Sequence, residues 1–189
     1  MTRAAQFFLV CLALAFWWAW PGTSPVPAPV AAVNAAPGQP FRLVRYTLYP
    51  LQSFELQARI LHREDYHFDR ESELSPTDLA LGWGPMADPA VLAQVRITQG
   101  NRWYHWHAER MPLPRREIET HSANMHLIPG DAQVARTLAN LREGQTIELQ
   151  GELVKVVGDD GWTWISSLSR EDTGAGACEL IWVQHLAVR

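Results

Sequence analysis

The stretch Phe54-Glu55-Leu56-Gln57-Ala58-Arg59-Ile60 decides the fold class of this chain. Its apolar residues alternate strictly with charged or amide residues, the period-2 pattern of a strand that is buried on one face. An α-helix would instead repeat its apolar positions every three or four residues. We therefore expect a strand over residues 54–67, and another just before it over residues 41–49.

Turn signals organise the middle of the chain. Gly100-Asn101 separates two strand-like runs, residues 96–99 and 102–106, and this pattern predicts a β-hairpin. Ser75-Pro76-Thr77-Asp78 predicts the start of a short helical turn that Gly82 ends. Asp88-Pro89 repeats that signal, with an N-cap residue followed by proline at the first helical position.

The last third of the chain predicts one helix and three strands. Asp131 caps a helix near residues 131–143 that carries its apolar residues on one face and is closed by Gly144. The strands are expected over residues 146–157, 162–168 and 178–186. The fold class that follows is α+β and mainly antiparallel, either a small barrel or a twisted sheet, with an OB-like barrel as one candidate.

The N-terminus has the pattern of a membrane anchor. Residues 4–20 are apolar except for Gln6, and as a helix they would span roughly 25 Å, the lower limit for crossing a bilayer. A cleaved signal peptide is the alternative. Aromatic residues typical of a membrane interface end the stretch, and no Ala-x-Ala site follows directly, so a retained transmembrane helix is favoured. The aromatic residues are Phe16, Trp17, Trp18 and Trp20.

The distribution of basic residues predicts the orientation of this anchor. Arg3 precedes the apolar stretch, and no basic residue follows it until Arg42. The positive-inside rule then puts the N-terminus in the cytoplasm of a bacterium and the rest in the periplasm. Residues 21–40 are rich in proline and alanine, which predicts an extended linker. Residues 41–189 are expected to form a single β-rich domain.

Composition limits the classes of partner. The formal net charge of -4 at pH 7 comes without a visible basic face, so nucleic acid is not expected as a partner. The two cysteines, Cys11 and Cys178, would be separated by the membrane boundary, which argues against a disulfide between them. No catalytic-cysteine signature surrounds Cys178, and a buried apolar role is the favoured reading.

Histidines give the sharpest candidate site. His105 and His107 lie two residues apart on an expected strand, so they share one face. Glu117, Glu119 and His121 would share one alternation if that stretch is extended, and His126 follows. Imidazoles with a carboxylate are ligands of catalytic zinc and non-haem iron. Because the spacing matches no metal motif, hydrogen-bonding or surface histidines are the favoured alternative.

Aromatic and polar side chains give a second candidate site. An exposed aromatic row would form a stacking platform for a sugar or peptide, whereas a buried row would fill the core of a small barrel. Polar residues of the region around 115–124 are expected to contact a ligand or partner if the stretch is a loop. The candidate binding residues are Trp103, Tyr104, Trp106, Arg115, Arg116, Asn124, Trp162 and Trp164.

Residues 95–183 contain several distinctive segments. They are residues 99–104 (QGNRWY), 121–129 (HSANMHLIP), 160–164 (DGWTW), 166–168 (SSL) and 172–180 (DTGAGACEL). On these segments the chain resembles a family of uncharacterised exported or membrane-anchored proteobacterial proteins. The resemblance implies export and brings no assigned activity with it.

No motif specifies a reaction, so catalytic residues are not assigned and enzymatic activity is left open. The leading hypothesis is a membrane-tethered periplasmic accessory module, without a cofactor, that contacts a partner protein, a membrane complex or an envelope polymer. The alternative is an envelope hydrolase that uses the four histidines and zinc or iron.

Overall fold

The computed structural model describes residues 38–172, 174 and 176–189. The predicted anchor at residues 4–20 and nearly all of the linker lie outside these residues. Within the described part, no helix is long and apolar enough to cross a membrane.

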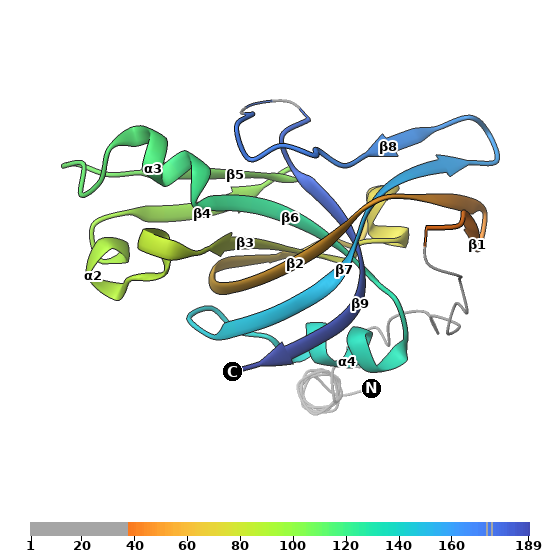
Figure 1. Cartoon of the computed structure of the whole chain (residues 1–189), viewed down its shortest axis with the longest axis horizontal. Coiled ribbons are helices and arrows are strands. Elements are labelled where there is room, and N and C mark those ends of the chain that lie inside the picture. The colour runs from red at the N-terminus through yellow and green to blue at the C-terminus, as the bar shows by residue number, and fades with distance from the viewer. Residues whose placement is uncertain (1–37, 173, 175) are drawn as a thin grey trace, which may run out of the picture.

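The described residues form an α+β structure of mainly antiparallel strands with few helices (Figure 1). The strands are β1 (Phe41–Leu43), β2 (Tyr46–Asp65), β3 (Thr77–Gly82), β4 (Arg96–Gly100), β5 (Trp103–His107), β6 (Ser122–Pro129), β7 (Thr146–Gly158), β8 (Thr163–Ile165) and β9 (Glu179–Val188). The α-helices are α2 (Pro89–Leu92), α3 (Arg115–Thr120) and α4 (Ala132–Asn140), and 3-10 turns cover Glu71–Glu73 and Gly84–Ala87.

The main sheet closes on itself. Its strand order is β1-β2-β3-β6-β9-β7-β8, and β2 also pairs with β7, so β2, β3, β6, β9 and β7 form a ring. The β2–β7 register runs from Tyr46↔Gly158 to Arg59↔Thr146, interrupted by a bulge between Pro50 and Gln52. All pairs in the ring are antiparallel except β6–β9. The long β2 strand therefore pairs with both β3 and β7, and this second pairing closes the ring.

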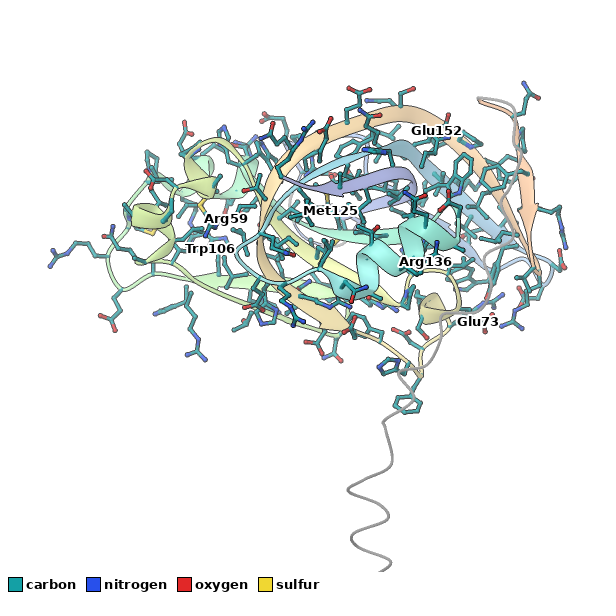
Figure 2. All side chains as sticks on the ribbon, turned by 90° about the horizontal axis from the view of Figure 1, so that it is seen from below. Arg59, Glu73, Trp106, Met125, Arg136 and Glu152 are labelled. Carbon is teal, nitrogen blue, oxygen red and sulfur yellow. The ribbon has the colours of Figure 1, made fainter. Side chains whose placement is uncertain are left out.

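Alternation along the strands places an apolar core inside this ring. Ala58 and Ile60 of β2 are buried there, as the period-2 pattern predicts, together with Met125 and Leu127 of β6. Figure 2 shows Met125 inside the ring and α4 lying across its lower opening. Apolar side chains of α4 complete this core, namely Val134 and Leu138.

Helix α4 confirms the predicted helix and its cap. The Asp131 carboxylate accepts hydrogen bonds from the backbone N–H groups of Gln133 and Val134, both at 2.8 Å. The helix ends at Asn140, a few residues before the predicted Gly144. The guanidinium of Arg63 donates to the carbonyls of Leu138 and Leu141 and so satisfies this C-terminus.

A second, two-stranded sheet lies beside the ring. It is the predicted hairpin of β4 and β5, with Gly100 paired to Trp103. The two turn residues are Asn101 and Arg102, which have φ of 52° and 67°, so the turn lies one residue later than predicted. The predicted helical turn at Asp88-Pro89 is α2, with the Asp88 carboxylate accepting from the N–H of Ala90. In Figure 1 this hairpin, α2 and α3 gather on one side of the ring.

Four local predictions are wrong. The strands predicted over residues 41–49 and 54–67 are not separate at residues 50–53, because β2 runs unbroken from Tyr46 to Asp65 and only Phe41–Leu43 form β1 before it. Residues 77–82 form the buried strand β3 and not a helical turn, because this short apolar run pairs with β2 on one side and β6 on the other. Residues 115–120 are the helix α3, so Glu117, Glu119 and His121 do not share an extended face. The strand predicted over residues 162–168 is shorter, Thr163–Ile165, since only these residues pair with β7.

Candidate functional site

A cavity of about 520 Å³ lies between β5, α3, β6 and the segment that leads into β9. In Figure 1 that segment passes over β5 and β6 between β8 and β9. The side chains that line the cavity include Trp103, Tyr104, His105, Trp106, His107, Arg115, Glu119, Ser122, Asn124, Arg170, Asp172 and Cys178.

The outer face of the ring forms the polar floor of this cavity. Because side chains alternate along β6, Ala123, Met125 and Leu127 point into the core, and Ser122, Asn124 and His126 take the opposite face. Asn124 and His126 are nonetheless 1% and 4% exposed, because the hairpin covers Asn124 and the Trp164 ring packs against His126. Asn124 has hydrogen-bond partners, whereas His126 Nδ1 lies close to Asp78 without a hydrogen bond.

Arg102 joins the hairpin to the ring. Its guanidinium lies 2.7 Å from an Asp69 carboxylate oxygen and 2.8 Å from Asp78, whose side chain is fully buried. It also lies 3.8 Å from the centre of the Tyr66 ring, at cation–π distance. Arg102 has a left-handed backbone conformation. The contacts of its side chain with Asp69, Asp78 and Tyr66 hold the residue in this conformation.

Further hydrogen bonds fix the hairpin over β6. The Gln99 amide donates to the side-chain oxygen of Asn124, and the Asn124 amide donates to the Arg102 carbonyl at 3.1 Å. The Tyr104 hydroxyl donates to the Ser122 carbonyl at 3.2 Å. Burial raises the pKa of Tyr104, so its hydroxyl stays protonated and remains a donor at neutral pH.

His126 lies beside the buried carboxylate of Asp78. Its Nδ1 is 2.9 Å from Asp78 Oδ2. Burial disfavours the charged imidazole, but Asp78 and Cys178 outweigh it and raise the pKa of His126 to about 9. The Trp164 ring, 4.8 Å from the imidazole, covers it. His126 is therefore an imidazolium at neutral pH, with the buried Asp78 carboxylate beside its Nδ1.

The segment before β9 is held in place by serines. The Ser167 N–H donates to the Cys178 carbonyl at 3.0 Å, and the Ser167 hydroxyl donates to Asp172 at 2.6 Å. The Ser166 hydroxyl accepts from the N–H of Leu180 at 3.0 Å. Cys178 is half-buried in the cavity wall, so the expectation of a buried apolar role is wrong.

Arg170 lines this cavity together with Cys178 and Tyr104. It forms an ion pair with the buried Glu179, and burial lowers its pKa against the opposing effects of Asp172, Tyr104 and Cys178. A second guanidinium, Arg115, lies 4.9 Å above the Trp106 ring and 3.1 Å from Glu119. The cavity therefore combines two guanidinium groups with an aromatic surface.

The structure separates the four histidines predicted as metal ligands. His105 and His107 line the cavity, whereas His126 lies below it against Asp78. His121 is turned toward α3, with Nδ1 2.9 Å from the Glu117 carbonyl. Among the residues that the structure describes, no group of three or more His, Cys, Asp or Glu side chains is arranged for a metal ion. Zinc or iron binding stays a prediction.

The predicted binding residues divide into two groups. Trp103, Tyr104, Trp106, Arg115 and Asn124 line the cavity. The other three do not line it. Trp162 and Trp164 pack against the core cluster around Tyr46, and the ring centres of Trp162 and Tyr46 are 5.7 Å apart. Arg116 forms an ion pair with Glu171.

Sequence reasoning missed Asp78, Cys178 and Arg170 as site residues. Asp78 was assigned to a helical turn, and no sequence motif links it to His126 or Cys178. The signal that was present is a charged residue inside an apolar run, Thr77-Asp78-Leu79-Ala80-Leu81, because a carboxylate buried in a strand needs a cationic partner.

Comparisons with protein-family models and with curated protein sequences find no match to this chain. The functional argument therefore depends on the geometry of the cavity.

Proposed function

We propose that this protein is a membrane-tethered periplasmic module that binds a segment of an envelope polymer in the cavity between β5, α3 and β6. The observation that carries the proposal is the cavity itself, about 520 Å³ in volume, lined by aromatic and cationic side chains. That volume is within the range of small-molecule sites and takes a few sugar or peptide units of a longer chain.

The order of the ring strands supports this position for a site. Numbered along the chain, the ring strands follow the order 1-2-3-5-4, strands 3 and 5 are parallel, and α4 connects strands 3 and 4. We infer an OB-like barrel from this order. OB-folds bind oligosaccharides and oligonucleotides on the face of strands 2 and 3 and with the loop between strands 4 and 5. Here these are β3, β6 and the segment that carries Arg170 and Cys178.

The lining favours a ligand with flat apolar faces and carboxylates. Trp103, which is 41% exposed, presents a ring face suited to stacking on a sugar or an aromatic group. Arg115 and Arg170 place guanidinium groups in this lining. Each already pairs with one protein carboxylate, Glu119 or Glu179, and a guanidinium has five N–H donors, so further donors remain for a ligand carboxylate. Glycan or peptide segments of the bacterial envelope that bear carboxylates combine both features.

The proposed location rests on the N-terminal sequence. An apolar segment at residues 4–20, basic residues only on its N-terminal side and a proline-rich linker are the features of an exported domain held near the inner membrane. A binding module tethered this way meets envelope polymers or a neighbouring membrane complex at high local concentration.

Isothermal titration of the full chain in detergent with soluble muropeptides, the sugar–peptide fragments of the cell wall, tests the proposal. Binding is expected, and Trp103→Ala is expected to weaken it about tenfold, since stacking on one aromatic ring contributes on the order of 1–3 kcal/mol. Tyr49→Ala, a change at a 40% exposed residue of β2 that does not line the cavity, is the matched control and should bind like the parent. Equal loss in both variants, or no binding by the parent, would refute the proposal.

A further inference from the structure

The cavity follows one edge of the β4–β5 hairpin. Its lining includes every residue from Trp103 to Ala108 without a gap. Neighbouring residues of a strand point their side chains to opposite faces, so a space on one face would touch only every second residue. A space that touches all of them lies along the edge of the strand, next to its backbone. On its other edge β5 pairs with β4, and among the residues that the structure describes it pairs with no further strand.

The turn of the hairpin determines which backbone groups of β5 bond to β4. Asn101 and Arg102 have φ of 52° and 67°, and positive φ at both central residues marks a type I′ turn. In this turn the N–H of Trp103 donates to the carbonyl of Gly100, and these two residues are the first pair of the ladder. Gly100 and Trp103 are therefore a hydrogen-bonded pair, and bonded and non-bonded pairs alternate from there along the antiparallel strands.

This alternation leaves two residues of β5 with free backbone groups. His105 and His107 follow Trp103 at intervals of two and bond to β4, whereas the N–H and C=O groups of Tyr104 and Trp106 point toward the cavity. Within the described part of the chain, these groups of Tyr104 and Trp106 make no other hydrogen bond. The two residues lie about 7 Å apart along the strand, the spacing at which a further strand would bond to them.

We propose that the ligand of this cavity contains an extended peptide segment that pairs with the free edge of β5 as a third strand of the hairpin sheet. The inference rests on the proposed function and deepens it, because it names the peptide part of an envelope polymer as the part that the cavity recognises. Hydrogen bonds between the two backbones supply affinity in this mode of binding, and pockets for alternate side chains supply specificity.

The free backbone groups favour a peptide over a glycan. Each of the two residues offers one donor and one acceptor, and this pair recurs after two residues. Another extended backbone has the same groups at the same repeat, whereas a glycan carries hydroxyl groups around rings and has no such repeat. The five residues of β5 span about 17 Å, so roughly four or five residues of a peptide fit along them.

Strand β5 also lacks the features that protect exposed edges from pairing. Such edges usually carry lysine, proline, an inward-pointing charge or a bulge. Residues 103–107 are WYHWH, which includes no lysine or proline, and their pairing with β4 has no register shift. The strands at the two ends of the main sheet order, β1 and β8, are only three residues long and offer less backbone to a ligand.

The guanidinium groups of the lining select for an acidic peptide. Arg115 lies at the start of α3, and Arg170 lies in the segment before β9. Each pairs with one protein carboxylate and has further N–H donors. A carboxylate of the bound peptide, on a side chain or at its end, can accept from these donors.

Amide hydrogen exchange, measured by NMR on the full chain in detergent, tests the pairing. Soluble muropeptides at about ten times their Kd should slow exchange at Tyr104 and Trp106 about tenfold, because exchange then proceeds from the unliganded fraction. The amides of His105 and His107 already donate to β4 and should change far less. Equal slowing at all four amides, or unchanged exchange at Tyr104 and Trp106 with ligand bound, would overturn the proposal.

Parts of the muropeptide distinguish peptide from sugar recognition. The stem peptide, which is the muropeptide without its sugars, should protect the same two amides, and the disaccharide alone should protect neither. Methylation of the backbone nitrogens of the stem peptide should abolish the protection, because it removes the donors to the carbonyls of Tyr104 and Trp106. If the methylated peptide bound as tightly as the unmodified one, the backbone pairing would be wrong.

Two variants at one position isolate a single backbone group. Trp106→Pro and Trp106→Ala both remove the indole, but only proline also removes the N–H that points toward the cavity. Proline is tolerated in an edge strand where its nitrogen faces away from the partner strand. W106P should bind the stem peptide about fivefold more weakly than W106A, since it lacks one hydrogen bond to the ligand. Equal affinities of the two folded variants would overturn the pairing.

The two proposals can fail separately. Muropeptide binding without protection of Tyr104 and Trp106 would reject the strand pairing and leave the binding module standing. Absence of muropeptide binding in the parent protein would reject the proposed function and, with it, this choice of ligand.

Discussion

The buried imidazolium of His126 predicts how stability depends on pH. Its pKa in the folded protein is about 9, whereas an unperturbed histidine has a pKa of about 6.5. Because the folded pKa is raised, the folded state binds a proton more tightly than the unfolded chain. The resulting stabilisation is fully present below about pH 6.5 and is lost as the pH rises to about 9.

The size of the effect follows from the same two values. The difference between the folded and the unperturbed pKa of His126 corresponds to about 3 kcal/mol of unfolding free energy, since each pKa unit contributes about 1.4 kcal/mol. The titratable groups that raise the pKa of the imidazole are Asp78 from β3 and Cys178 beside β9, and Arg102 forms an ion pair with the other oxygen of Asp78. The uncharged Trp164 ring packs against the His126 imidazole and shields it from solvent.

Urea denaturation of the full chain in detergent, followed by tryptophan fluorescence between pH 6 and pH 9.5, measures this dependence. The parent protein should lose about 3 kcal/mol over this range, and His126→Gln should lose much less. His185→Gln, at an exposed histidine of the same sheet, should keep the parental slope. If the parent and His126→Gln showed parallel pH profiles, the buried ion pair with Asp78 would be wrong.

Three further changes test the fold and the site. Asp78→Asn leaves Arg102 and His126 without their shared anion and should cost about 3–5 kcal/mol of unfolding free energy in urea; a loss under 1 kcal/mol would contradict this network. Gly151→Ala would put a Cβ 2.2 Å from the Trp182 carbonyl oxygen, so β7 and β9 must separate. The unfolding free energy measured in urea should fall by about 2 kcal/mol or more. Gly100→Ala is the control and should be neutral, because nothing lies within 4 Å of the added Cβ. If both glycine variants were neutral, the close approach of β7 to β9 would be wrong. Arg170→Gln should weaken muropeptide binding, because it removes a guanidinium from the cavity lining, and unchanged binding would show that Arg170 does not contact the ligand.

Local sequence patterns predicted the elements whose signal is contained in one segment. The alternation over residues 54–60, the hairpin around residues 100–101 and the cap at Asp131 each depend on neighbours in sequence, and the structure confirms all three elements. The α+β class with mainly antiparallel strands followed from counting these elements.

Elements decided by long-range pairing were predicted poorly. Thr77 and Asp78 have the residue types of a helix start, but β2 and β6 pair with this segment and make it a strand. Ring closure by β2 and β7 depends on a register between segments far apart in the chain, which no local pattern reveals. Pairing with distant strands outweighs weak local propensity in such segments.

The sequence predicted only part of the candidate site, because long-range strand pairing brings the remaining residues to it. The aromatic and polar residues of β5 and the start of α3 were identified because they cluster in sequence. Asp78 and Cys178 were not predicted as site residues because each is unremarkable among its own neighbours, and the β3–β6 pairing that places Asp78 opposite His126 is long-range.

The most direct test of the proposed cavity is NMR of the tryptophan indole N–H groups during titration with soluble muropeptides. The full chain in detergent contains nine tryptophans, and single Trp→Phe changes assign the signals. Trp103 and Trp106 line the cavity, whereas Trp182 lies 4% exposed in the core beside Phe41, at a ring distance of 4.3 Å. We predict saturable shifts at Trp103 and Trp106 with Trp182 unmoved. Shifts confined to other tryptophans, or none at all, would contradict the assignment of this cavity as the binding site.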